Sequence, residues 1–154
     1  MLEIRQAKKS DIPCLVELDD KCFDTYYYRK TKFSKSDFHA YFGLKKPIFL
    51  VATRDFRLVG YVAGAVRSSE GLSIAHLDSL AVSSIERNQG LGGNLLQLFI
   101  EEAKKEACMK VVMEVAKANK EGLNFFLKRG FRGVADLPEY YGQDLDGVLM
   151  ERSV

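Results

Sequence analysis

The sequence has little net charge, no long apolar run and few cysteines. Lys and Arg total 23 against 21 Asp and Glu, and the two signs are interspersed along 154 residues. Because no basic or acidic face results, we expect neither nucleic-acid nor membrane binding. No apolar run approaches the roughly 18 residues that a membrane-spanning helix needs, and the segment Met1 to Arg5 does not resemble a signal peptide. These absences favour a cytoplasmic protein.

The three cysteines, Cys14, Cys22 and Cys108, show no CxxC spacing and lie in apolar or amphipathic segments. This pattern is typical of reduced, structural thiols, and it indicates neither a metal site nor a catalytic cysteine. No repeat, linker or low-complexity segment interrupts the chain. With 47% apolar residues, a chain of this length can bury one substantial core, so we expect a single domain over residues 1–154.

Apolar periodicity and turn residues predict alternating helices and strands. After Gly90, apolar residues recur every four positions from Leu91 to Ala107, which gives the clearest helix. In chain order we expect strand 2–5, helix 10–23, a loop with a short helix over 24–36, short helix 36–42, strands 48–53, 58–67 and 73–82, the long helix, strand 110–116, helix 120–129 and strands 131–134 and 146–152. Ser10 with Asp11, and Ser36 with Asp37, are the expected helix caps.

This order predicts an α+β fold with flanking helices around a mixed sheet. Three consecutive strands joined by short turns form an antiparallel meander. The strand 110–116 follows a helix, as expected of a parallel crossover from strand 73–82. Two parallel strands that diverge at their ends leave a cleft between them. On strand 73–82 we expect His76, Asp78, Leu80 and Val82 to share one face, because strand side chains alternate.

A glycine-rich turn, Arg87-Asn88-Gln89-Gly90-Leu91-Gly92-Gly93, joins an apolar strand to the long helix. Unpaired N–H groups and the helix dipole make such a junction a phosphate-binding site. A P-loop would need Lys followed by Ser or Thr after Gly93, where Asn94 stands, and a dinucleotide fingerprint would need glycine at Leu95. The pattern Arg87-x-x-Gly90-x-Gly92 instead resembles the pyrophosphate loop of the GNAT superfamily of N-acetyltransferases.

Further motifs extend this resemblance along the chain. Glu114-Val115-Ala116-Lys117-Ala118-Asn119, followed by Gly130-Phe131, is similar to a block in bacterial enzymes that acetylate the amino-terminal alanine of a ribosomal protein. Tyr140-Tyr141-Gly142 resembles the tyrosine loop of amino-terminal acetyltransferases. The resemblance implies transfer of an acetyl group from acetyl-coenzyme A to a primary amine, without a metal. It also implies cofactor contacts from Leu80, Ala81, Val82, Arg87, Asn88, Gln89, Gly90, Leu91, Gly92, Gly93, Asn94, Asn119 and Phe126.

Such a reaction needs a base, because only a neutral amine attacks a carbonyl. His76 matches the position of a catalytic Glu or His in related histone and arylalkylamine acetyltransferases, and Asp78 matches a second His of the latter. Glu114 matches the proposed base of the ribosomal-protein enzymes. Histidine titrates near neutrality, whereas a carboxylate would need burial to raise its pKa. Both Glu114 and His76 therefore stay candidates.

One position departs from the family pattern. Seven residues after Asn119 the family usually has a tyrosine that protonates the departing thiolate, and here Phe126 stands. Since a thiol with a pKa near 8.5 is a tolerable leaving group, this change can lower the rate without abolishing turnover. Tyr140 or Tyr141 could replace the missing hydroxyl if their loop folds over the cleft.

Three functions follow as hypotheses. The first is acetylation of a protein amino terminus, with Tyr140 and Tyr141 contacting the peptide. The second is acetylation of a small amine, such as a polyamine, amino acid or antibiotic-like amine, with the segment 24–42 shaping the pocket; Tyr26 and Tyr28 could line it or simply pack beneath a loop. The third is a non-catalytic acyl-coenzyme A sensor, suggested by Phe126. A homodimer through strand 146–152 also stays open.

Overall fold

A computed structural model describes residues 1–23, 26–28 and 31–154. The predicted loop residues Asp24, Thr25, Arg29 and Lys30 lie outside the described residues. In the described part, a sheet of seven strands has the order β1-β2-β3-β4-β5-β7-β6. The strands are β1 (Leu2–Gln6), β2 (Pro47–Arg54), β3 (Arg57–Ser69), β4 (Leu72–Val82), β5 (Lys110–Ala116), β6 (Arg132–Leu137) and β7 (Gly147–Ser153). The helices are α1 (Ile12–Cys22), α2 (Lys35–Ala40), α3 (Leu91–Lys105) and α4 (Lys120–Leu127), with 3₁₀ turns η1 (Lys9–Asp11), η3 (Tyr41–Gly43) and η4 (Ser84–Glu86).

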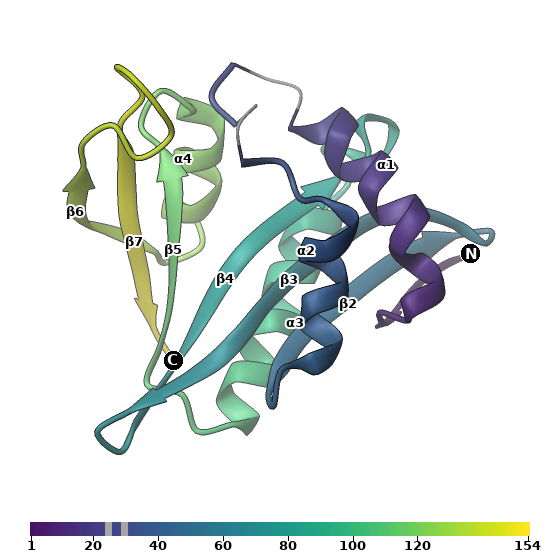
Figure 1. Cartoon of the computed structure of the whole chain (residues 1–154), viewed down its shortest axis with the longest axis horizontal. Coiled ribbons are helices and arrows are strands. Elements are labelled where there is room, and N and C mark those ends of the chain that lie inside the picture. The colour runs from purple at the N-terminus through teal and green to yellow at the C-terminus, as the bar shows by residue number, and fades with distance from the viewer. Residues whose placement is uncertain (24–25, 29–30) are drawn as a thin grey trace.

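The sheet is covered on both faces, as Figure 1 shows. Helices α1 and α2 cover one face, where a core around Tyr61 and Phe38 forms. Helix α3 covers the other face with Leu95 and Phe99, and Phe126 of α4 joins the same core. The predicted α+β fold, with its antiparallel meander and parallel pair, is confirmed.

Helix α3 follows its predicted apolar stripe. The buried residues are Leu91, Leu95, Leu96, Phe99, Ile100 and Ala103. Ala107 lies beyond the helix end, with a positive φ of 57°. Gly90 caps the other end with φ of 83°, a left-handed conformation that glycine adopts without steric cost. The chain can therefore turn sharply from the loop into the helix.

The two predicted amino-terminal caps are wrong in detail. Ser34, not Ser36, accepts the hydrogen bond from the Asp37 N–H, and the Asp37 carboxylate accepts from the Ser34 N–H in return. This reciprocal capping box starts α2. Asp11 does not cap α1 with its side chain, because its carboxylate forms an ion pair with Arg5.

Strands β4 and β5 diverge after a short parallel contact. Only three residue pairs join them, from Ile74 with Lys110 to His76 with Val112. Beyond His76, β5 continues its pairing with β7, while β4 continues along β3. Figure 1 shows the two strands splaying apart beyond this contact. Side chains of both strands line one cleft, so the predicted cleft between diverging parallel strands is present.

A bulge in β4 changes which side chains share a face. Ala63 pairs with Ser79 and Gly64 with Leu77, so Asp78 is the extra residue. Gly64 is required there, because a Cβ would lie 2.1 Å from the His76 carbonyl oxygen. The prediction that four alternate residues share one face is wrong, because it assumed unbroken alternation. Asp78 contacts Tyr41 on the α2 side, whereas Leu80 and Val82 pack with the α3 core.

In the described residues no helix combines the length and hydropathy that crossing a membrane requires.

Candidate active site

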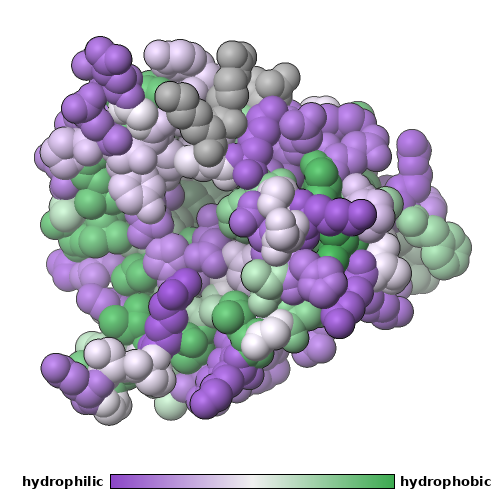
Figure 2. Space-filling model, in the orientation of Figure 1, coloured by the Kyte–Doolittle hydropathy of each residue, from purple (hydrophilic) through white to green (hydrophobic). Residues whose placement is uncertain are grey.

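A cleft of about 980 Å³ opens where β4 and β5 diverge. Its walls come from α1, α4 and the 140–141 loop, and its far end reaches the start of α3. Figure 2 shows the molecular surface hollowed between the α2 side and the β5–β7 side. Most of the predicted site residues line this cleft: His76, Asp78, Leu80, Ala81, Val82, Arg87, Asn88, Gly90, Leu91, Gly92, Gly93, Glu114, Asn119, Phe126, Tyr28, Tyr140 and Tyr141.

Three predicted residues are not among those that line the cleft. The side chain of Gln89 donates to the Ile85 carbonyl oxygen, and the Asn94 N–H donates to Gly90 within the helix. Tyr26 is 68% exposed. Its neighbour Tyr27 lines the cleft instead. In an aperiodic loop, the sequence has no signal that decides which tyrosine points inward.

The start of α3 presents free backbone donors to the cleft. The first i to i−4 bond of the helix runs from the Asn94 N–H to Gly90, so the amides of Leu91, Gly92 and Gly93 precede it. Added Cβ atoms on Gly92 and Gly93 would lie 3.4 Å from Phe125 and 3.1 Å from Arg129. The glycines therefore let Phe125 and Arg129 pack close against the helix start, where the unpaired N–H groups and the helix dipole favour negative charge.

Two guanidinium groups flank this helix start. Arg87 lies beside β4, where its Nε donates to the Val82 carbonyl oxygen at 3.2 Å. Arg129, which sequence reasoning missed, reaches over from the end of α4. It stacks 3.8 Å above the Phe125 ring and donates to the Phe125 carbonyl oxygen at 2.9 Å. In the sequence, a basic residue near the end of a helix needs no further explanation. Only the packing of α4 against α3 shows that Arg129 also lies beside the start of α3.

Asn119 and Tyr28 meet at the opposite side of the opening. Asn119 caps α4 by accepting from the Gly122 N–H at 3.0 Å, and its Nδ2 donates to the Tyr28 hydroxyl at 3.0 Å. The Ala116 N–H, at the end of β5, donates to the same hydroxyl at 3.1 Å. Phe126 lines the cleft from α4 but is only 9% exposed. Both polar groups of Asn119 are thus engaged within the protein.

The floor of the cleft carries an imidazole between two carboxylates. Nδ1 of His76 is hydrogen-bonded to Asp78, and Nε2 lies 2.9 Å from each oxygen of Glu114. The side chains are 18 to 23% exposed. Hydrogen bonds, first to Asp78 and then to Glu114, raise the pKa of His76 to about 9 although burial opposes this. At neutral pH the group is therefore an imidazolium held by two anions.

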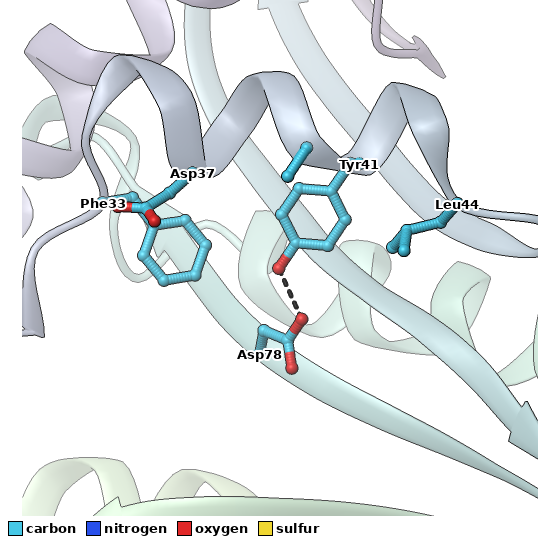
Figure 3. Close-up of a pocket in the computed structure, with 6 residues that line it drawn as sticks. Phe33, Asp37, Tyr41, Leu44 and Asp78 are labelled. Carbon is cyan, nitrogen blue, oxygen red and sulfur yellow. Dashed lines mark hydrogen bonds between the residues drawn. The ribbon is translucent and has the colours of Figure 1, made fainter.

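Tyr41 extends this cluster toward α2. Its hydroxyl donates to the second carboxylate oxygen of Asp78, as Figure 3 shows. Burial and the negative charge of Asp78 raise the pKa of Tyr41 well above its ordinary value. Tyr41 and Asp78 also line a shallow pocket of about 230 Å³, together with Phe33, Asp37, Ala40 and Leu44. The tyrosine fixes Asp78, which in turn fixes His76.

The two tyrosines of the 140–141 loop lie in different surroundings. Tyr141 is 8% exposed, and its ring packs edge-on against Tyr28 at 5.1 Å. Burial, with contributions from Tyr28 and Tyr140, raises its pKa. Tyr140 is half exposed, and burial followed by the negative charge of Glu114 raises its pKa. The loop therefore folds over the cleft beside the imidazole cluster.

The described residues contain no group of three or more His, Cys, Asp or Glu side chains arranged to hold a metal ion. In the cluster at the cleft floor, the two ring nitrogens of His76 face different carboxylates. The three free cysteines also lie apart, with Cys14 exposed, Cys22 half-buried and Cys108 buried.

A mixed sheet with a splayed parallel pair, a glycine-rich helix start with unpaired N–H donors, and an imidazole between two carboxylates form the arrangement expected of an acyl-coenzyme A-dependent transferase. Residues 12–131 match the model of the Acetyltransferase (GNAT) family. The chain belongs to this family and is an acetyl-coenzyme A-dependent N-acetyltransferase. Among solved structures of the same fold is a PaiA N-acetyltransferase of Thermoplasma acidophilum in complex with coenzyme A, with a TM-score of 0.79 at 20% identity over 100% of this chain and 99% of its own.

Individual relatives support this assignment. An uncharacterized N-acetyltransferase of Methanocaldococcus jannaschii, MJ1530, is 30% identical over 96% of this chain and 88% of its own length. An N-alpha-acetyltransferase of Sulfurisphaera tokodaii is 30% identical over 66% of each chain. The ribosomal-protein-alanine N-acetyltransferase of Brucella melitensis has a structure that superimposes with a TM-score of 0.81, at 25% identity, over 99% of both chains.

Proposed function

We propose that the chain acetylates the amino terminus of a protein or peptide. The observation that carries the proposal is the contact between His76 and Glu114 beneath Tyr140 and Tyr141. This cluster lies in an open cleft, so that an extended chain can enter with its terminal amine first. The relatives described as N-alpha-acetyltransferase and ribosomal-protein-alanine N-acetyltransferase support the same acceptor class.

In the proposed reaction, Glu114 removes a proton from the acceptor ammonium. The nitrogen lone pair then attacks the thioester carbonyl, and a C–N bond forms. The nitrogen loses its second proton to solvent, and the C–S bond breaks as its electrons pass to sulfur. His76 is protonated near pH 7, so it serves as a positive partner that orients Glu114 rather than as the first proton acceptor. The cluster, two carboxylates and one imidazolium, has net negative charge and attracts an ammonium group.

The pyrophosphate of acetyl-coenzyme A would bind at the α3 start, between Arg87 and Arg129. The pantetheine arm would pass along the exposed edge of β4 beyond His76, where β5 no longer pairs with it. Leu80 and Val82 can offer backbone groups there. The acetyl group would then lie above the bulge at Asp78, within reach of the cluster.

The test is release of coenzyme A by the purified protein, measured on a peptide panel that varies the first two residues and, in parallel, on polyamines, amino acids and aminoglycosides. We expect kcat/KM for the best peptide to exceed that for every small amine by at least about tenfold, a difference of about 1.4 kcal/mol. A small amine that exceeds all peptides would contradict the proposal. Tight binding of coenzyme A with no acceptor turned over would favour the sensor hypothesis instead.

A further inference from the structure

The sequence leaves the departing thiolate without its usual proton donor, because Phe126 has no hydroxyl. We propose that Tyr28, from the segment between α1 and α2, is the catalytic residue that protonates the sulfur. The inference rests on the proposed direct transfer to an amine, but not on which amine is the acceptor.

The hydrogen bonds of Tyr28 suit a proton donor. Its oxygen accepts from the Ala116 N–H at 3.1 Å and from Asn119 Nδ2 at 3.0 Å. A phenol oxygen that accepts two hydrogen bonds still has its own O–H to donate. Both N–H donors would also stabilise the phenolate that remains after proton transfer. The protein thus supplies at Tyr28 what a general acid needs.

The position of Tyr28 places this hydroxyl at the cleft. Ala116 ends β5, on the far side of the opening from β4, and Asn119 caps α4. Phe126 lies on the same helix and lines the same cleft. The ring of Tyr28 is held from two sides, edge-on to Phe23 at 5.5 Å and to Tyr141 at 5.1 Å. The Tyr28 hydroxyl is therefore held at the cleft, at the junction of β5 and α4.

The two other candidate donors are less suited. Tyr140 faces Glu114, on the side of the cluster where the acceptor amine is expected. Tyr141 is buried, and no N–H group of the described residues is recorded as donating to its hydroxyl, so a phenolate there would lack the two donors that Tyr28 has. In the balanced step, the C–S electron pair takes the Tyr28 proton. The phenolate is then reprotonated from solvent as coenzyme A leaves.

The test compares Tyr28→Phe with Tyr26→Phe, a neighbouring tyrosine that is 68% exposed and is not among the residues lining the cleft, using whichever acceptor the wild type acetylates. We expect kcat to fall about 100-fold in Tyr28→Phe, the lower end of the usual range for a general acid, and to change less than about twofold in Tyr26→Phe. The dissociation constant for coenzyme A, measured by calorimetry without acceptor, should be unchanged in both.

A second experiment restores a hydroxyl to the Tyr28→Phe variant, to distinguish a catalytic role of Tyr28 from a role in packing. Adding Phe126→Tyr to Tyr28→Phe should recover most of the lost kcat. If the double variant does not fold, added phenol should raise kcat of Tyr28→Ala instead. An unchanged kcat in Tyr28→Phe, a loss that neither hydroxyl restores, or an equal loss in Tyr141→Phe would overturn the assignment. The proposed function has its own contradicting outcome, which is that small amines turn over faster than peptides, and that outcome leaves the assignment of Tyr28 unaffected.

Discussion

At the scale of single residues, the pKa of His76 depends on both of its carboxylate partners. The hydrogen bond to Asp78 is the largest cause of its raised pKa, and the bond to Glu114 comes second. We therefore expect NMR titration of the imidazole to give a pKa near 9 in the wild type. Asp78→Asn should lower the pKa more than Glu114→Gln does. The exposed His39 gives a second imidazole signal, and a pKa of His76 near 6.5 would contradict the ion-paired arrangement.

Replacing Glu114 removes the proposed base while keeping its size. We expect Glu114→Gln to lower kcat/KM about 100-fold, the lower end of the range for general-base catalysis. The control is Glu121→Gln, because Glu121 also lines the cleft but is exposed on the first turn of α4. Both variants should bind coenzyme A like the wild type. A fall of less than about threefold in Glu114→Gln would remove Glu114 from the role of base.

The residues of this cluster could be predicted one at a time but not as a unit. Motif resemblance points to His76 and Glu114 separately, although 38 positions divide them. Their contact depends on the parallel register that pairs His76 with Val112, which brings Glu114 two residues further along the diverging strand. Tyr41 could not be predicted, because a hydrophobic helix end gives no sign that one hydroxyl reaches across to Asp78.

At the scale of elements, apolar periodicity correctly predicted the helices and strands whose formation depends on residues close in the chain. The α3 stripe and the β2–β3–β4 meander agree with expectation, because each depends on residues close in the chain. The bulge at Asp78 could not be predicted from alternation, since the same apolar pattern fits a regular strand. Gly64 hinted at a bulge or a close backbone approach, and its partner strand shows both. The bulge lets β4 supply Asp78 to one side and Leu80 to the other.

The packing of α4 on the start of α3 gives Arg129 an effect on cofactor binding. Since a charge-assisted hydrogen bond contributes about 1.5–3 kcal/mol, we expect Arg129→Gln to raise the dissociation constant for coenzyme A at least about tenfold. Lys128→Gln removes the same charge from the next position, which is exposed and does not line the cleft, and should leave the constant near the wild-type value.

Calorimetry with coenzyme A, 3′-dephospho-coenzyme A and pantetheine would locate the contact. Loss of affinity for the first two ligands, with pantetheine unaffected, indicates the pyrophosphate, and loss for the first alone indicates the 3′-phosphate. Equal weakening by Lys128→Gln would show that only the general positive charge of α4 matters.

At the scale of the whole molecule, the cluster couples stability to pH. The folded-state pKa of His76, about 9, lies above the value of 6.5 expected in the unfolded chain. The folded protein therefore binds the proton more tightly, and this contribution is complete below pH 6.5 and is lost as pH rises toward 9. For a side chain that is 23% exposed, the shift corresponds to at most about 3 kcal/mol.

We accordingly expect the free energy of unfolding, measured with urea at fixed ionic strength, to fall between pH 6.5 and 9. His76→Asn should flatten this fall, because the variant has no imidazole to bind the proton. The variant should also unfold more easily than the wild type at pH 6.5, where two carboxylates face each other without a cation. By pH 9 the difference in the free energy of unfolding between the variant and the wild type should become smaller. Equal slopes in the two proteins would show that other groups set the pH dependence, and that the imidazolium between β4 and β5 does not stabilise the junction of the two strands.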